Sequence, residues 1–452
     1  MNYLPYSQYK QSWRDWLGEV PDHWEVLSIK RLTPVSRGAS PRPIEDPKYF
    51  DEEGEYAWVR IADVTSNHHY LRETTQRLSD LGKSFSVALE PGSLFLSIAG
   101  SVGKPMITAI KACIHDGFVY FPQLKINFEF LYYIFESGQP YLGLGKFGTQ
   151  LNLNTDTVGG IKIGLPPREE QDAIAEFLDW KTGQIDALIE KKKELLEKLT
   201  EKRIAVITQA ITQGLNPAAP MRDSGIPWLG QVPEHWEVKR LRRFVDEIEQ
   251  GWSPQCDNAA ASLDEWGVVK AGCCNGGRFN PDENKALPPE LDAPESLEIK
   301  GGELLMSRAS GSEELIGSAA LVPLGTRDKL LLSDKTYRLR CDEKAVQPAF
   351  LAHALQSPVG RYQIQAAISG AFGLARNIAQ SDVKDLVFAI TPITEQVAIT
   401  QVLDHATGEL DSLAAKVESA IDRLTEYRTA LITAATTGKI DVRQVKIPQP
   451  GA

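Results

Sequence analysis

The sequence predicts an α/β protein in which two tandem mixed α/β domains are joined by two long helices. The helices are expected to pair as an antiparallel coiled coil, which gives the chain pseudo-twofold symmetry. Three observations predict this fold. The chain repeats itself after a little over two hundred residues, each repeat contains short β-rich runs, and each repeat ends in a long segment with an apolar residue every seven positions.

The repeat consists of two well-matched blocks. "WLGEVPDHWEV", starting at Trp16, matches "WLGQVPEHWEV", starting at Trp228, at an offset of 212 residues. "PREEQDAIAEFLDWKTGQIDALI", starting at Pro167, matches "PITEQVAITQVLDHATGELDSLA", starting at Pro392, at an offset of 225. A unit of this length is too long for a solenoid repeat, so whole domains have been duplicated.

The interiors of the two copies differ from each other, although short similar segments remain, such as "GSLFLS" at 92–97 and "GELLMS" at 302–307, offset by 210 residues. Runs rich in β-branched and aromatic residues lie between Gly and Pro turns, as expected of strands. Strands are predicted over 56–64, 93–100, 266–272 and 302–309, and short helices over 130–137 and 350–357. Each copy is therefore a compact mixed α/β domain.

The repeated tail of each copy predicts a helix of about forty residues, roughly 60 Å long. "LPPR" at 165–168 marks the start of the first helix, because proline is tolerated in a first turn. The apolar stripe at heptad position a comprises Leu178, Ile185, Leu199 and Val206 in the first copy and Leu403, Leu410, Val417, Leu424 and Leu431 in the second. Leu188, Leu195, Leu413 and Tyr427 are among the residues at position d.

These elements give five segments. They are a first domain over 1–166, a central helix over 167–215, a linker and second domain over 216–391, a distal helix over 392–440, and a tail over 441–452. The linker and second domain allow the chain to double back, so that the helices pair with each other. The alternative is that each helix packs only on its own domain; the length and regular heptads favour pairing.

Composition restricts the class of protein. The chain has 452 residues and a formal net charge of −11, which argues against a free-standing nucleic-acid binder. It has no apolar run long enough for a transmembrane helix, and its first residues lack the apolar region of a signal peptide. Five cysteines without C-x-x-C spacing favour a reduced, cytoplasmic location.

No motif predicts catalysis or metal binding. "GSVGKP" at 100–105 lacks the first glycine and the final Ser/Thr of a phosphate-binding loop. His68 and His69 are adjacent, so on a strand they would point to opposite faces, which suits a single metal ion poorly; loop or surface positions are expected instead. The sequence therefore predicts no catalytic residue and no metal ligand in this chain.

Several polar residues suit contacts with DNA bases, because Arg reads guanine and Asn or Gln reads adenine through paired hydrogen bonds. They lie in or near predicted strands and loops. The candidates are Arg60, Gln150, Asn152, Ser307, Arg308, Arg376 and Asn377. For each of them, a solvated surface group is the alternative interpretation.

The two "WLG(E/Q)VP(D/E)HWEV" segments resemble the opening of the target-recognition domains in specificity subunits of type I restriction–modification systems. "NGGRFNPDENKALP" at 275–288 and the two "EQ" helix starts resemble other parts of the same family, and the likeness extends from about residue 16 to residue 442. The first copy departs from the pattern at 12–16, where "SWRDW" stands in place of "SGIPW" at 224–228.

The resemblance implies a non-catalytic subunit. Its two target-recognition domains would each read one half of a bipartite, asymmetric site in double-stranded DNA, and its helices would fix the spacer. Two modification (methyltransferase) subunits and two restriction (motor and nuclease) subunits would be its partners. S-adenosylmethionine, ATP and Mg would bind to those partners rather than to this chain. The alternatives are a protein-only coiled-coil adaptor and an enzyme with unrecognised motifs.

Overall fold

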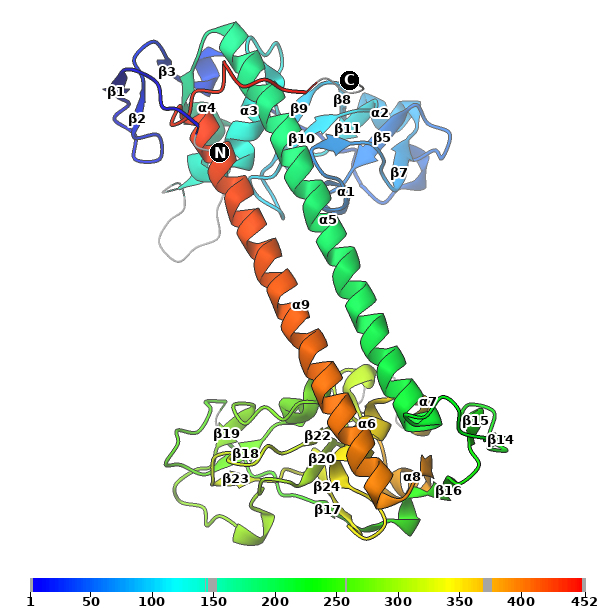
Figure 1. Ribbon diagram of the computed structural model, residues 1–452. Helices are drawn as coiled ribbons and strands as arrows, with labels where there is room; N and C mark the ends of the chain where they lie inside the picture. The colour runs from blue at the N-terminus through cyan, green and yellow to red at the C-terminus, as the bar shows by residue number, and fades with distance from the viewer. Residues whose placement is uncertain (1–2, 143, 145–152, 257, 369–375, 449–452) are drawn as a thin grey trace. The chain divides into compact units, whose positions relative to one another are not determined.

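The computed structural model describes residues 3–142, 144, 153–256, 258–368 and 376–448 (Figure 1). The chain divides into two compact units, one made of residues 1–193 and 418–452 and the other of residues 194–417. Each unit contains an α/β part, which we call its head, and one half of each long helix. The first head covers residues 3–166 and the second head covers residues 216–391.

The two heads share one strand order. The first head has a sheet ordered β4 (Ser36–Arg37), β12 (Phe118–Tyr120), β9 (Leu94–Ser97), β10 (Pro105–Thr108), β6 (Tyr70–Leu71), and another ordered β7 (Gln76–Leu78), β5 (Tyr56–Val59), β11 (Ala112–Ile114), β8 (Val87–Leu89). The second head has β17 (Val245–Gln250), β24 (Thr336–Cys341), β20 (Leu304–Ser307), β22 (Ala319–Leu321), and β19 (Asn284–Ala286), β18 (Gly267–Val269), β23 (Leu330–Leu331). The first head therefore adds β6 and β8 to a common frame.

Smaller ladders also recur. The first head pairs β1 (Tyr9–Gln11) with β2 (Glu19–Pro21) and β3 (Glu25–Ser28) with β13 (Lys162–Leu165). The second pairs β14 (Met221–Asp223) with β15 (Gln231–Pro233), β16 (Glu237–Arg240) with β26 (Val387–Ile390), and β21 (Ala309–Ser310) with β25 (Arg376–Asn377). The short helices are α1 (Ile61–Ser66), α2 (Asp80–Ser84), α3 (Phe128–Glu136), α4 (Thr155–Gly160), α6 (Pro348–Gln356), α7 (Pro358–Ala367) and α8 (Gln380–Asp385).

Two of the predicted strands are wrong at their second half. The strand predicted over 56–64 ends at Val59, and the chain turns into α1 because the Asp63 carboxylate accepts the backbone N–H of Arg60 at 2.8 Å and that of Thr75 at 3.2 Å. The strand predicted over 266–272 ends at Val269 and continues as a 3-10 helix, η5 (Ala271–Gly277). The helices predicted over 130–137 and 350–357 are confirmed as α3 and α6.

The long helices are α5 (Arg168–Gln213) and α9 (Ile393–Thr436). Both begin in the same way. The Gln171 side chain donates to Pro166 O (2.9 Å) and accepts from Asn127 N (2.9 Å), while the Gln396 side chain donates to Thr391 O (2.7 Å) and accepts from Gln347 N (2.8 Å). The repeated glutamine thus connects the start of each helix to α3 or α6, the helix of its own head.

Each long helix packs into the cores of both units. In the first unit, Leu178 and Ile185 of α5 lie in one apolar cluster with Leu431 and Ile432 of α9. In the second unit, the equivalent cluster includes residues from the end of α5 and the start of α9; these are Ile207, Ala210, Ile211, Ile399 and Leu403. The alternative in which each helix packs only on its own domain is therefore wrong.

In each unit the two long helices lie side by side and run in opposite directions (Figure 1). In the first unit, Arg428 Nε donates to Asp186 Oδ1 at 2.8 Å. In the second unit, Arg203 Nε lies 3.6 Å from Asp411 Oδ1. Because Arg203 and Asp186 correspond to Arg428 and Asp411 at the repeat offset of 225, the two units make the same contact with the roles of the helices exchanged.

Candidate nucleic-acid interface

The first head brings several polar side chains together where β5 ends beside the edge strand β7. Arg60 follows β5 directly, its side chain is 43% exposed, and its Nε lies 3.7 Å from Asp63 Oδ2. Its Nη2 donates to Thr75 Oγ1. Asp63 and Thr75 thus hold the guanidinium at the end of the strand, while Nη1 has no hydrogen bond or ion pair within the part of the chain that the structure describes.

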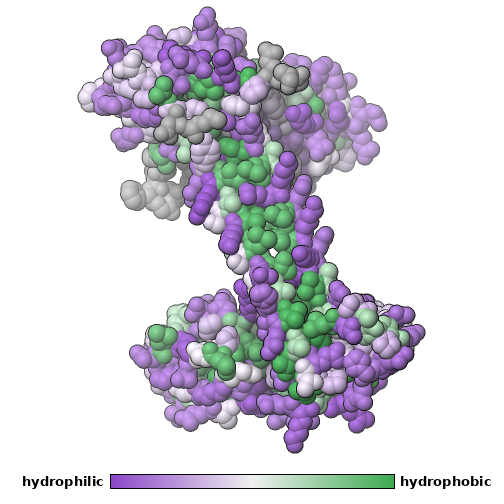
Figure 2. Space-filling model, viewed as in Figure 1, coloured by the Kyte–Doolittle hydropathy of each residue, from purple (hydrophilic) through white to green (hydrophobic). Residues whose placement is uncertain are grey.

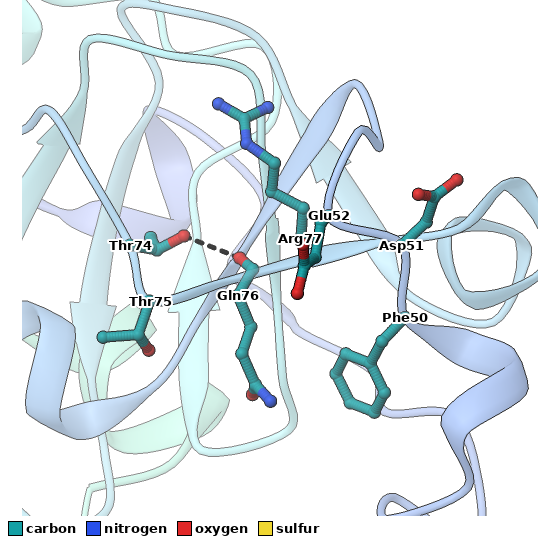
Figure 3. A pocket seen from close by; sticks show the side chains of 7 residues that line it. All are labelled: Phe50, Asp51, Glu52, Thr74, Thr75, Gln76 and Arg77. Atoms are coloured by element: carbon teal, nitrogen blue, oxygen red, sulfur yellow. Dashed lines mark hydrogen bonds between the residues drawn. The ribbon is translucent and has the colours of Figure 1, made fainter.

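Gln76, on β7, lies opposite Trp58 of β5 and is exposed. It lines two neighbouring pockets of about 640 Å³ each, one shared with Arg77 and Thr74, the other with Arg60 and His115. Figure 3 shows the Gln76 and Arg77 side chains pointing in opposite directions from the strand, as successive strand residues do. No hydrogen bond of the Gln76 amide to another described residue is found, so this group is available to a ligand.

His115 forms part of the wall of the second of these pockets. Burial lowers the pKa of His115, although Asp116 at 3.8 Å opposes that shift. The ring is therefore mostly uncharged at neutral pH, and its Nδ1 accepts the backbone N–H of Gly117 at 2.8 Å. Of the residues that line this pocket, Arg60 is cationic, Glu45 is acidic, and the others are uncharged or largely so.

The second head brings together four residues that the sequence singled out. Ser307 ends β20, Arg308 follows it, and β21 then pairs with β25, which contains Arg376 and Asn377. Arg308 Nη1 donates to Asp334 O at 3.2 Å, and Arg376 forms an ion pair with Glu313. The Ser307 hydroxyl is fully buried and has no hydrogen-bond partner among the described residues, so it faces the interior.

The remaining two candidates, Gln150 and Asn152, lie outside the described residues. Sequence reasoning missed Gln76, together with Lys270 and Lys285 of the second head. Lys270 follows β18 as Arg60 follows β5, and Lys285 lies opposite Val268 as Gln76 lies opposite Trp58. The sequence did contain one indication of this correspondence. The offset of 210 residues that aligns 92–97 with 302–307 also aligns Arg60 with Lys270.

The repeated His-Trp-Glu segments form the joint between each head and its long helix. Glu170 Oε1 accepts from Trp24 Nε1 (2.8 Å) and from the Tyr6 hydroxyl (2.6 Å), while its Oε2 lies 2.8 Å from His23 Nε2. Glu395 repeats this in the second unit with His235 at 2.8 Å and Trp236 at 3.3 Å. Although burial alone would raise it, the pKa of Glu395 is lowered by hydrogen bonds from Thr391 and His235.

His69 lies in the loop between α1 and β6, as the sequence predicts, but its side chain is only 21% exposed. Its ring stacks between Tyr70 and Tyr132, with centroid distances of 4.3 and 4.0 Å, and its Nε2 lies 2.6 Å from Glu129 Oε2. His69, Glu129 and Asp179 place one possible ligand atom each within 4.8 Å of one another. Glu129 also accepts from the Tyr70 hydroxyl, and Asp179 accepts from the Tyr133 hydroxyl.

Comparison with known proteins shows which family the chain resembles. A model of the type I restriction modification DNA specificity domain matches residues 21–200. The type I restriction enzyme EcoKI specificity subunit of Escherichia coli (strain K12) is 21% identical over 442 residues, which cover 94% of this chain and 90% of that protein. Over nearly its whole length the chain is similar to the specificity subunits of type I restriction–modification systems.

Two further similarities define how far the likeness extends. The EcoEI specificity subunit of Escherichia coli is 26% identical over 247 residues, which span 54% of this chain and only 41% of that relative. A chain solved in a study of complex assembly and conformational transition of the type I R-M system has a TM-score of 0.67 at 14% identity, covering 93% of this chain and 99% of that one. The second likeness confirms the predicted fold class: two mixed α/β domains joined by paired helices.

The described residues of the chain contain no helix that is both long and apolar enough to cross a membrane.

Proposed function

We propose that this chain is a non-catalytic DNA-recognition and scaffold subunit of a type I restriction–modification complex. Each head reads one half of a bipartite, asymmetric site in double-stranded DNA. The observation that carries this proposal is the shared strand order of the heads with different side chains at equivalent edges, such as Gln76 opposite Trp58 and Lys285 opposite Val268. Two half-sites of different sequence require two domains that share a fold and differ in their exposed side chains.

The paired helices would hold the partner subunits. Figure 2 shows hydrophobic residues gathered along the surface of α5 and α9. Leu188 and Leu413, which correspond at the repeat offset of 225, are 44% and 43% exposed, whereas Ile185 and Val417 at the neighbouring a positions are buried. Two equivalent exposed leucines, one in each unit, offer matching apolar contacts to two copies of one partner.

The partners inferred are two modification (methyltransferase) subunits and two restriction subunits in the cytoplasm. S-adenosylmethionine would bind to the modification subunits, and ATP and Mg to the restriction subunits, because no motif for these ligands is found in this sequence. The net charge of −11 fits a subunit whose partners supply part of the contact with phosphate.

Mapping methylated adenines across the genome, with and without this gene, tests the recognition role. We expect one bipartite motif to lose its methylation when the gene is deleted. An unchanged methylation pattern, together with no sequence-specific DNA binding by the purified complex, would favour a protein-only adaptor. Methyl transfer by the purified chain alone would instead show an enzyme.

Aspartate substitutions at the two leucines test the scaffold role. Leu188→Asp and Leu413→Asp should each remove one bound modification subunit, and the double variant should bind none, because a charge in an apolar contact is left without a partner. Native mass spectrometry of the co-expressed complex measures the stoichiometry. Ala187→Asp and Ser412→Asp introduce the same side chain at the adjacent, exposed and mutually equivalent positions, so they should retain both partners. Full assembly of the double leucine variant would contradict the proposal.

A further inference from the structure

Arg60 and Lys270 occupy equivalent places in the two heads. Each is the first residue after the central strand of the three strands that match in the smaller sheets, β5 and β18, and each is followed at once by a helical turn. Both are partly exposed. The Lys270 ammonium has no hydrogen bond or ion pair to another described residue, and Arg60 keeps its Nη1 unpaired there. A basic side chain has therefore been kept at this position although the heads differ around it.

The edge strand beside this position carries a different side chain in each head. β7 presents Gln76 opposite Trp58, and β19 presents Lys285 opposite Val268. Neither Gln76 nor Lys285 forms a side-chain hydrogen bond or ion pair with the rest of the described chain. A neutral amide in one head thus stands where the other head has a cation.

The two half-sites of an asymmetric DNA site differ in their bases and share their sugar–phosphate backbone. Residues that contact phosphate fix the position of the protein, and residues that contact base edges select the sequence. In a duplicated reader, contacts to the shared backbone can stay the same in both copies, whereas contacts to bases must diverge. Residues that are alike in the two heads are therefore candidates for phosphate contacts, and residues that differ are candidates for base contacts.

We propose that Arg60 and Lys270 each contact a backbone phosphate, and that Gln76 and Lys285 contact base edges of the first and second half-site. Arg60 was expected from the sequence to read a base, and the comparison of the heads reassigns it. The chemistry of each edge residue sets its preference: the Gln76 amide matches adenine, and the Lys285 ammonium matches the acceptors of guanine. This inference rests on the proposed function.

The experiment uses the full specificity subunit assembled with its modification subunits. DNA affinity is measured by competition at several salt concentrations, and base preference is measured on a library randomised at each half-site. Arg60→Ala and Lys270→Ala should each reduce the slope of log affinity against log salt by about 1, with base preference unchanged. Arg60→Lys should restore the slope, because it keeps the charge.

Substitutions on the edge strands should give the opposite result. Gln76→Ala should relax preference at one base pair of the first half-site by roughly ten- to a hundredfold with an unchanged salt slope, and Gln76→Lys should shift that position toward guanine. Lys285→Gln should alter the second half-site alone. Thermal unfolding close to that of the wild type shows that each variant is folded; Gln76 and Lys285 are edge residues whose side chains have no partner among the described residues.

The outcomes separate this inference from the proposed function. If the wild-type complex binds all sequences equally, the proposed function is wrong. If the wild type is selective but Arg60→Ala changes base preference without changing the salt slope, only the assignment of Arg60 is overturned. Unaltered base preference in both Gln76→Ala and Lys285→Gln would overturn the assignment of the edge strands.

Discussion

The two heads build the same sheet around different interiors. In the second head, Arg338 of β24 is buried, and its guanidinium donates to Glu249 at 2.8 Å and to Glu303 at 3.2 Å. It also donates to the backbone oxygens of Ser296 and Glu298, both at 2.9 Å. Arg340 binds the same two carboxylates at 2.7 and 2.8 Å. The hydrogen bonds from Arg340 and Arg338 outweigh burial and lower the pKa of Glu249.

The first head has no charges at the matching places. The strand register aligns Arg338 with Tyr120, Glu249 with Ser36 and Glu303 with Ser93. The second head therefore has a complete set of paired charges where the first head has hydroxyl and aromatic groups. The backbone accepts either set because no buried charge is left alone in either case.

Removing one member of the charged set should have the largest effect. Arg338→Met leaves Glu249 and Glu303 partly buried with only Arg340 to balance them, which should cost about 3–5 kcal/mol of unfolding free energy. Tyr120→Phe is the matched change in the first head and should cost less than about 1 kcal/mol, because no hydrogen bond of its hydroxyl to another described residue is found. Denaturant unfolding of the full chain measures both values. Equal losses of unfolding free energy in the two variants would show that the charged set in the second head stabilises it no more than the uncharged set stabilises the first head.

The joints between heads and helices provide a second comparison, in which the residues are the same but the contacts differ. The Glu170 side chain is 5% exposed and binds Tyr6, His23 and Trp24, whereas that of Glu395 is 28% exposed and binds Trp236 at the longer distance of 3.3 Å. Glu170→Ala should therefore cost about 1–3 kcal/mol, since it leaves buried donors unpaired, and Glu395→Ala should cost less. Calorimetric unfolding of the two variants decides the order; a larger loss for Glu395→Ala would contradict it.

The sequence predicted the fold from features that repeat. The offset of 225 located both long helices, and the apolar positions Leu178 and Leu403 predicted where they are buried. It could not predict that Leu188 and Leu413, at position d, are largely exposed, because a heptad does not say which of its positions face a partner chain. Only the packing of α5 and α9 shows which apolar heptad positions are buried and which are exposed.

The candidate site was predicted less completely. Residue type alone selected Ser307, which is buried, and passed over Gln76 and Lys285, which we propose to contact bases because of the strand that each one faces. His69, Glu129 and Asp179 come from three distant segments, so their spacing in the chain contains no sign that they meet. Contacts of this kind depend on how the strands and helices pack, which the local sequence does not specify.

The smallest effect expected concerns one carboxylate on α5 and its counterpart on α9. Asp179 accepts from the Tyr133 hydroxyl at 2.6 Å, and Asp404 lies 2.9 Å from His353 Nε2. Burial, with a further contribution from Glu129, raises the pKa of Asp179 above its ordinary value of 3.8. A carboxyl whose pKa is raised on folding stabilises the protein at low pH, and that contribution is lost as the pH rises through the folded pKa.

Asp179→Asn should therefore unfold at a slightly higher temperature than the wild type at pH 7, because the neutral amide still accepts from Tyr133 and lacks the cost of the partly desolvated charge. The difference should shrink on acidification and vanish below a pH of about 3.8, where the unfolded carboxyl is also protonated. Asp404→Asn is the matched change in the second unit; it removes the carboxylate partner of His353 and should give no gain. Melting curves from pH 3 to 8 measure these differences, and a constant offset between Asp179→Asn and the wild type would refute the electrostatic explanation.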